Sequence, residues 1–151
     1  MKIRKTSRRS VLILIAPGFD EKLVVSSLSS LRETGIAVSL VGLTPGLIRS
    51  GHGLWVRADY ALSELPPTVM PLLVFIPGNQ QCAAALVSDP RVYQLLEKTL
   101  AQDGVVAVTP EIQPVLGRVG FTDSMTVHEL LSRETMDSPE FVSRIVKPLA
   151  D

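Results

Sequence analysis

The side chains that could carry out chemistry in this chain are few and lie far apart in the sequence. Thr109 offers a hydroxyl that could act as a nucleophile, with His128 as its general base. The structural alternative is that Thr109 caps a helix continuing with Pro110, its hydroxyl accepting a backbone N–H. We expect the capping role, because a threonine hydroxyl is a poor nucleophile without a strong base beside it.

The other ionisable candidates also have two interpretations each. His128 could be a base or a ligand-binding donor, or a half-buried histidine bonded to a backbone carbonyl. Asp20 and Glu21 could supply a carboxylate to a pocket, or simply occupy a first helical turn, where the helix dipole favours negative charge. We prefer the structural role for Asp20 and leave Glu21 open. His52 stands between two glycines and is expected in a surface turn.

A loop of Pro77, Gly78 and Asn79 follows an apolar run and could line an anion site with its backbone N–H groups. Cys82, just beyond it, could be a displaced nucleophile. A cysteine followed by three alanines is more often a small buried apolar residue, and no basic neighbour in sequence would activate its thiol. The predicted ligand-binding set is Glu21, Gly78, Asn79, Thr109, Pro110 and His128, of which Thr109 and His128 would be catalytic if the protein is an enzyme.

Composition excludes several other functions. The chain has 151 residues and is 46% hydrophobic, enough for one domain with its own core. One cysteine and two histidines cannot make a cysteine-rich zinc site, so we expect neither a metal nor a cofactor. Fifteen basic residues balance fifteen acidic ones, which argues against nucleic-acid binding.

The charge distribution predicts a basic tail over residues 1–10 and a single domain over residues 11–151. The first nine residues carry five basic side chains, and an apolar run follows them. That run ends at Pro17 and Gly18, too soon for a signal peptide. No stretch approaches the roughly 18 apolar residues of a membrane span, so we expect a cytoplasmic protein with no membrane contact.

Buried strands and amphipathic helices alternate along the chain. Apolar runs at residues 11–16, 36–42, 72–76 and 105–108 are typical of buried strands, and residues 44–68 of a small hairpin or edge excursion in which Trp55 packs. Helix starts are expected at Asp20, Asp89, Thr109 and Ser138. This alternation predicts an α/β protein, a three-layer α/β/α sandwich with a mostly parallel sheet, in which ligands bind at the carboxyl ends of the strands.

Several segments spread along the chain form a recognisable series. They are APGFDE at residues 16–21, LRETGI at 31–36, VSLVGL at 38–43, LVFIPGN at 73–79, VVAVTPEIQPVL at 105–116, VGF at 119–121, TVH at 126–128 and the expected last helix at 139–150. In this order the segments resemble the DJ-1/PfpI superfamily (also called ThiJ/PfpI), and the likeness covers nearly the whole chain.

The resemblance implies a flavodoxin-like, class I glutamine amidotransferase-like fold and a homodimer. Family enzymes include glyoxalases, chaperone-like or deglycase proteins and proteins assigned as peptidases, which use a low-pKa cysteine at a strand-to-helix elbow, a glutamate on the first helix and often a histidine. Here the elbow position is Thr109 and the glutamate position is Leu23, while Asn79 replaces a glycine. Among the polar catalytic positions His128 alone matches, and the segment after it is short.

These departures lead us to expect a non-catalytic member of the superfamily, a binding or regulatory module for a small metabolite or a protein partner. A first alternative is a hydrolase or glyoxalase-like enzyme with displaced machinery built on Thr109 and His128. A second is a structural assembly protein whose oligomeric surface matters.

Overall fold

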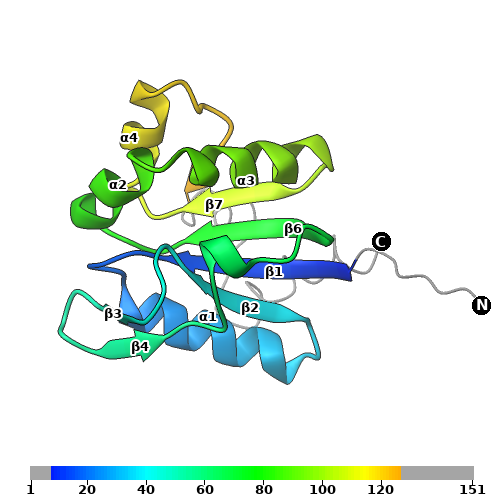
Figure 1. Cartoon of the computed structure of the whole chain (residues 1–151), viewed down its shortest axis with the longest axis vertical. Coiled ribbons are helices and arrows are strands. Elements are labelled where there is room, and N and C mark those ends of the chain that lie inside the picture. The colour runs from blue at the N-terminus through cyan, green and yellow to red at the C-terminus, as the bar shows by residue number, and fades with distance from the viewer. Residues whose placement is uncertain (1–7, 127–151) are drawn as a thin grey trace, which may run out of the picture.

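A six-stranded parallel sheet forms the centre of the molecule. The computed structural model describes residues 8–126, and Figure 1 shows the sheet with its flanking helices. The strand order is β5-β2-β1-β6-β7-β8, and every neighbouring pair is parallel. The strands are β1 (Arg8–Ile15), β2 (Val38–Gly42), β5 (Tyr60–Ala61), β6 (Val69–Ile76), β7 (Val105–Val108) and β8 (Met125–Thr126). The predicted α/β fold with a mostly parallel sheet is confirmed.

The two longest helices begin where their capping residues predict. Asp20 accepts a hydrogen bond from the backbone N–H of Leu23 and starts α1 (Glu21–Glu33), and Asp89 caps α3 (Pro90–Ala101) through Arg91. Such side-chain caps satisfy N–H groups that have no partner within the helix. The other helices are α2 (Gln80–Val87), α4 (Gln113–Arg118) and the 3-10 turn η1 (Leu62–Glu64).

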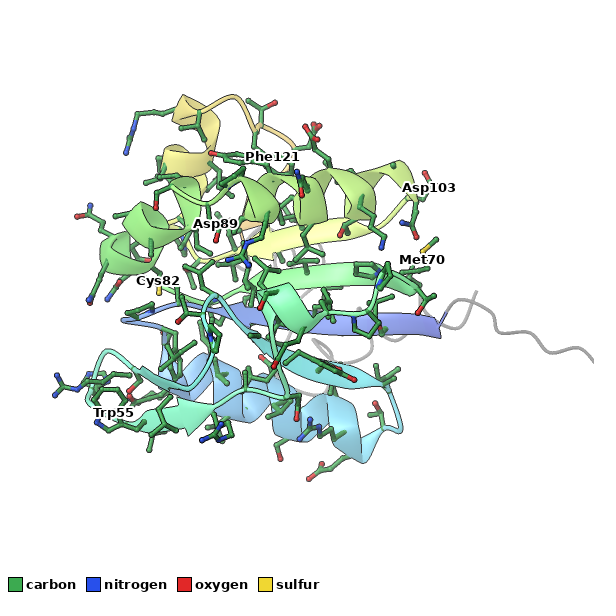
Figure 2. All side chains as sticks on the ribbon, viewed as in Figure 1. Trp55, Met70, Cys82, Asp89, Asp103 and Phe121 are labelled. Carbon is green, nitrogen blue, oxygen red and sulfur yellow. The ribbon has the colours of Figure 1, made fainter. Side chains whose placement is uncertain are left out.

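Two local expectations were wrong, and one helix was not predicted. The helix expected from Thr109 begins only at Gln113, and Thr109 is not its cap. Helix α2 was not predicted; its eight residues lack a helical apolar period, and it starts because the Asn79 side chain accepts hydrogen bonds from two of its backbone N–H groups. The hairpin of β3 (Leu47–Arg49) and β4 (Trp55–Arg57) is antiparallel as predicted, but Trp55 is 59% exposed and does not pack (Figure 2).

The core is continuous because the central strands are covered on both faces. Residues 11–16 are at most 1% exposed, and β1 aligns Val11 with Leu73 and Ile13 with Phe75 across the β1–β6 pair. Continuous apolar strands of this kind require helices on both sides of the sheet. Figure 1 shows α1 beside β2 at one end of the sheet and α3 beside β6 and β7 at the other, with α2 in contact with α3 and α4.

The order of the strands places a crevice between β1 and β6. From β1 the chain moves to β2 and β5 on one side, and from β6 it moves to β7 and β8 on the other. Right-handed crossovers in opposite directions put α1 and α3 on opposite faces, and the chain leaves β1 and β6 in diverging directions. In such sheets the crevice at the carboxyl ends of the two strands is the usual ligand site.

The residues beyond these bounds include two sequence expectations. His128 and the helix expected at Ser138 lie outside the described residues. Within residues 8–126, none of the helices has the length and apolar character needed to cross a membrane.

Two turn positions give a matched test of the backbone. Gly35 and Asp103 both have positive φ, of 83° and 63°, and the space around the Gly35 Cα is open. We expect Gly35→Ala to lower the free energy of unfolding by about 1 kcal/mol, because the left-handed conformation strains a residue with a Cβ. Asp103→Gly should raise it by about 0.5 kcal/mol for the same reason. Urea denaturation checks both, and a stabilised Gly35→Ala protein would contradict this description of the turn.

Candidate functional site

Three loops meet at the carboxyl ends of β1 and β6. The N–H of Gly18, after β1, donates to the carbonyl of Arg49 at 2.9 Å, and the N–H of Gly51 donates to the carbonyl of Phe19 at 2.9 Å. The N–H of Asp20 donates to the carbonyl of Pro77, after β6, at 3.0 Å. Main-chain hydrogen bonds therefore fix the mutual positions of the loops, and the side chains that the loops carry share one crevice.

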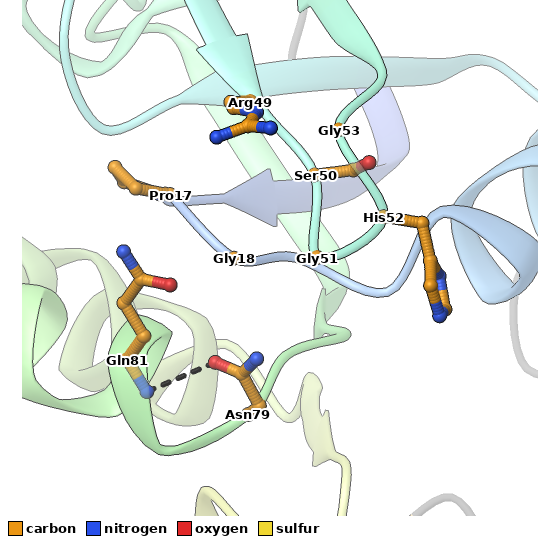
Figure 3. Close-up of a pocket in the computed structure, with 9 residues that line it drawn as sticks. All are labelled: Pro17, Gly18, Arg49, Ser50, Gly51, His52, Gly53, Asn79 and Gln81. Atoms are coloured by element: carbon orange, nitrogen blue, oxygen red, sulfur yellow. Dashed lines mark hydrogen bonds between the residues drawn. The ribbon is translucent and has the colours of Figure 1, made fainter.

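A cavity of about 400 Å³ lies in this crevice, within the usual size range of small-molecule sites (Figure 3). Arg49, Asn79 and Gln81 contribute the long polar side chains, and Figure 3 shows Arg49 on one side of the Pro17–Gly18 segment and Gln81 on the other. The remaining lining residues are Pro17, Gly18, Ser50, Gly51, His52 and Gly53.

Gly18 lets the β1 loop pass close beneath these side chains. Its φ is 92°, and a Cβ built there would lie 2.7 Å from Gln81 Oε1 and 3.0 Å from Asn79 Oδ1. A larger residue would be strained at this φ, and the Gln81 and Asn79 carboxamides would have to shift to make room for its Cβ. The floor of the cavity therefore depends on glycine at this position.

Glu21 fastens the turn after β3 rather than projecting into the cavity. Its Oε1 accepts hydrogen bonds from the Ser50 hydroxyl and, at 3.2 Å, from the backbone N–H of His52. Ser50 Oγ in turn accepts from the N–H of Leu54 at 2.9 Å, and the His52 imidazole Nδ1 lies 3.6 Å from Glu21 Oε2. The Ser50 hydrogen bond is the main cause that lowers the pKa of Glu21, because it stabilises the ionised carboxylate.

The Thr109 hydroxyl is engaged on both sides. Thr109 is only 5% exposed; its Oγ1 accepts from the N–H of Gly78 at 3.0 Å and donates to the carbonyl of Gly78 at 2.6 Å. This pair of bonds ties β7 to the loop after β6 and replaces the helix cap that we expected. A nucleophilic hydroxyl must pass its proton to a base, whereas this proton is held by a carbonyl oxygen.

Cys82 is buried, as the preferred interpretation of its sequence predicted. Its thiol donates to the carbonyls of Ala16 at 3.2 Å and Pro17 at 3.3 Å. Burial raises the pKa of the Cys82 thiol, because a thiolate would lose its hydration there. The side chain thus packs beneath the crevice as a neutral group.

The predicted ligand-binding residues that the structure describes do not share one location or role. Asn79 lines the cavity, Gly78 holds Thr109, and Glu21 holds the turn at Ser50. Pro110 is exposed in the turn before α4 and does not line the cavity. Sequence reasoning did not assign Arg49 or Gln81 to the site; the glycine-punctuated turn directly after Arg49 was the signal that could have indicated it. Within residues 8–126 no cluster of three or more metal-ligating side chains occurs.

Glu21→Gln tests the tether to Ser50. Glu21 has a folded-state pKa below its ordinary value of 4.5, so its stabilising contribution is present above about pH 4.5 and is lost as the pH falls through the folded-state pKa. We expect the wild type to be more stable than Glu21→Gln near neutral pH and the difference to shrink in acid. Thermal unfolding from pH 7 to pH 3 measures it, and a constant difference would contradict the tether.

The sequence is similar to proteins of one known family. The DJ-1/PfpI family pattern matches residues 9–147. A deglycase from Thermococcus kodakarensis is 32% identical over 91 residues, which are 60% of this chain and 49% of that protein. The chain thus spans about half the length of this relative.

Solved structures agree with this result. A DJ-1 superfamily protein from Salmonella typhimurium superposes with a TM-score of 0.68 at 28% identity, covering 76% of this chain and 62% of that one. DJ-1beta from Drosophila melanogaster has the same TM-score at 24% identity, covering 74% and 60%, and shares the fold. The parallel sheet, the loops at its carboxyl edge and the match over nearly the whole sequence lead to one conclusion: the chain belongs to the DJ-1/PfpI family.

Proposed function

We propose that this protein is a non-catalytic DJ-1/PfpI member that binds a small molecule or a protein partner at the crevice between β1 and β6. The observation that carries the proposal is the state of Thr109 at the elbow. Its hydroxyl is buried and bonded to both backbone groups of Gly78, so neither its proton nor its oxygen is free for a substrate. Activating it would cost two hydrogen bonds in a desolvated place.

Two further features support the absence of turnover. Leu23, at the position where the family resemblance implies a glutamate, is a partly buried apolar residue packed against the core. Cys82 is neutral, buried and bonded to main-chain carbonyls, which is the opposite of the exposed, electropositive surroundings that activate a thiol. The described crevice therefore offers polar side chains for binding without an activated nucleophile.

The test is turnover of methylglyoxal and of a generic ester by the purified full chain. We expect no rate above buffer for wild type, Thr109→Ala or Cys82→Ser, because neither hydroxyl nor thiol is activated. The Thermococcus kodakarensis deglycase, assayed in parallel, shows that the assay detects activity. Thr109→Ser, which keeps the hydroxyl, controls for damage to folding.

Turnover by wild type that disappears in Thr109→Ala and survives in Thr109→Ser would overturn the proposal. The second candidate function, a hydrolase or glyoxalase-like enzyme using Thr109 and His128, would then hold. The observation that favours this candidate is the 32% identity to a protein named a deglycase. Turnover that disappears in Cys82→Ser would overturn the proposal as well and would identify the thiol as the nucleophile.

We also propose that the protein is a homodimer, as the family resemblance implies, joined through the exposed apolar side chains of the hairpin and α1. Leu47 is 55% exposed, Leu54 46%, Trp55 59% and Val25, on α1, 57%. Val25 and Leu54 also line one shallow groove on this side of the molecule. Exposed apolar side chains that lie near one another are typical of protein interfaces, and aromatic residues such as tryptophan commonly anchor them.

Light scattering during size exclusion tests the dimer. We expect wild type at twice the chain mass of 16.4 kDa and the double variant Leu54→Ser with Trp55→Ser at the chain mass, because the variant loses the apolar contacts. Val119→Ser, at an exposed valine after α4, is the matched control and should remain dimeric. A monomeric wild type, or an unchanged double variant, would contradict this interface.

A further inference from the structure

We propose that the crevice cavity binds a small carboxylic acid, with the Arg49 guanidinium on its carboxylate and the Asn79 and Gln81 carboxamides on a second oxygen. This inference rests on the proposed binding function and gives its ligand a chemical class. It depends on which hydrogen-bonding groups around the cavity are already used and which are not.

Arg49 is the one arginine or lysine among the residues that line the cavity. It is exposed and makes no hydrogen bond or ion pair with another described residue. Figure 3 shows its guanidinium extending from the end of β3 above the Pro17–Gly18 segment. A guanidinium presents a planar fork of N–H donors, and the geometry of that fork matches the two oxygens of a carboxylate.

Asn79 and Gln81 lie across the cavity from Arg49. Asn79 uses Oδ1 to accept from the N–H groups of Gln81, at 2.9 Å, and Cys82, at 3.1 Å, so its amide group Nδ2 remains a donor. This group faces the turn after β3, since a Cβ built on Gly51 would lie 4.0 Å from it. The Gln81 carboxamide makes no hydrogen bond with another described residue and lies directly over Gly18.

The rest of the lining adds neither a carboxylate nor a free backbone donor from its glycines. The N–H groups of Gly18, Gly51 and Gly53 all donate to main-chain carbonyls. The Glu21 carboxylate lies behind Ser50 and accepts hydrogen bonds from the Ser50 hydroxyl and the His52 N–H. The unused groups are therefore side-chain donors around one guanidinium, an arrangement that is complementary to an anion rich in acceptors.

The hydrogen bonds of the glycine N–H groups favour a carboxylate ligand over a phosphate ligand. Phosphate sites in α/β folds use rows of free backbone N–H groups at a glycine-rich turn or a helix N-terminus. Here those glycines bond to main chain, and Asn79 itself fills the first turn of α2. A planar carboxylate on Arg49 needs none of these groups, and about 400 Å³ suits a compact molecule of a few carbons.

Isothermal titration calorimetry on the full chain tests the inference. The probes are succinate, neutral succinamide of the same shape, and inorganic phosphate. We expect succinate to bind, and the other two to bind at least tenfold more weakly. Arg49→Gln should weaken succinate binding by roughly tenfold or more, through loss of the charge-assisted pair. Arg57→Gln, an exposed arginine on the neighbouring strand β4, is the matched control and should bind as wild type does.

Asn79→Asp gives a second variant that preserves the fold. Its carboxylate still accepts from the N–H groups that start α2, so thermal stability should stay close to wild type. The same carboxylate replaces a donor with a negative charge, so we expect succinate binding to fall by roughly tenfold or more. A folded Asn79→Asp protein that binds succinate like wild type would overturn the assignment.

The remaining outcomes are equally decisive. No heat with succinate at millimolar concentration, equal binding of succinamide or phosphate, or wild-type binding by Arg49→Gln would each overturn the carboxylate site. The proposed non-catalytic function fails by a different measurement, namely turnover of methylglyoxal or an ester that is present in wild type and absent in Thr109→Ala or Cys82→Ser. A protein without turnover that does not bind succinate would overturn the carboxylate site and agree with the non-catalytic proposal. A protein with turnover that binds succinate only when Arg49 is present would overturn the non-catalytic proposal and support the carboxylate site.

Discussion

The parallel pairing of β1 with β6 brings two loops together that are about sixty residues apart in the chain, and the site depends on this pairing. The chain leaves these strands in opposite directions, so neither loop covers the other. Three main-chain hydrogen bonds, from Gly18, Asp20 and Gly51, then join the loops after β1, β3 and β6. Because backbone groups make these contacts, the side chains of the loops are left to line the cavity.

The polar groups of the crevice divide into those that hold the fold and those that are unused. The hydroxyls of Ser50 and Thr109, the carboxylate of Glu21 and the thiol of Cys82 all bond within the protein. Such buried or half-buried groups are costly to leave unpaired, and each of them has a hydrogen-bond partner here. The Arg49, Gln81 and Asn79 side chains keep N–H donors that make no hydrogen bond with another residue of 8–126, and these donors support the binding function that we propose.

Much of the architecture could be predicted, because the signals are local. The apolar run of β1 and the caps at Asp20 and Asp89 depend on neighbouring residues alone, and the structure confirms all of them. Helix α2 escaped prediction, since its start depends on the Asn79 rotamer and its sequence has no marked apolar period. The role of Thr109 was predicted wrongly, because Gly78, its partner, is 31 residues away and lies on another strand's loop.

The sequence by itself determined the alternation of buried strands with helices, the α/β fold class and the family. These properties are properties of residue type and spacing along one chain. Only the tertiary structure decided that Glu21 binds Ser50, that Thr109 binds Gly78 and that the Arg49 side chain has no hydrogen-bond or ion-pair partner among residues 8–126. Each of these results depends on which polar groups meet in the folded protein, because hydrogen-bond partners that are distant in sequence come within reach only when the chain has folded.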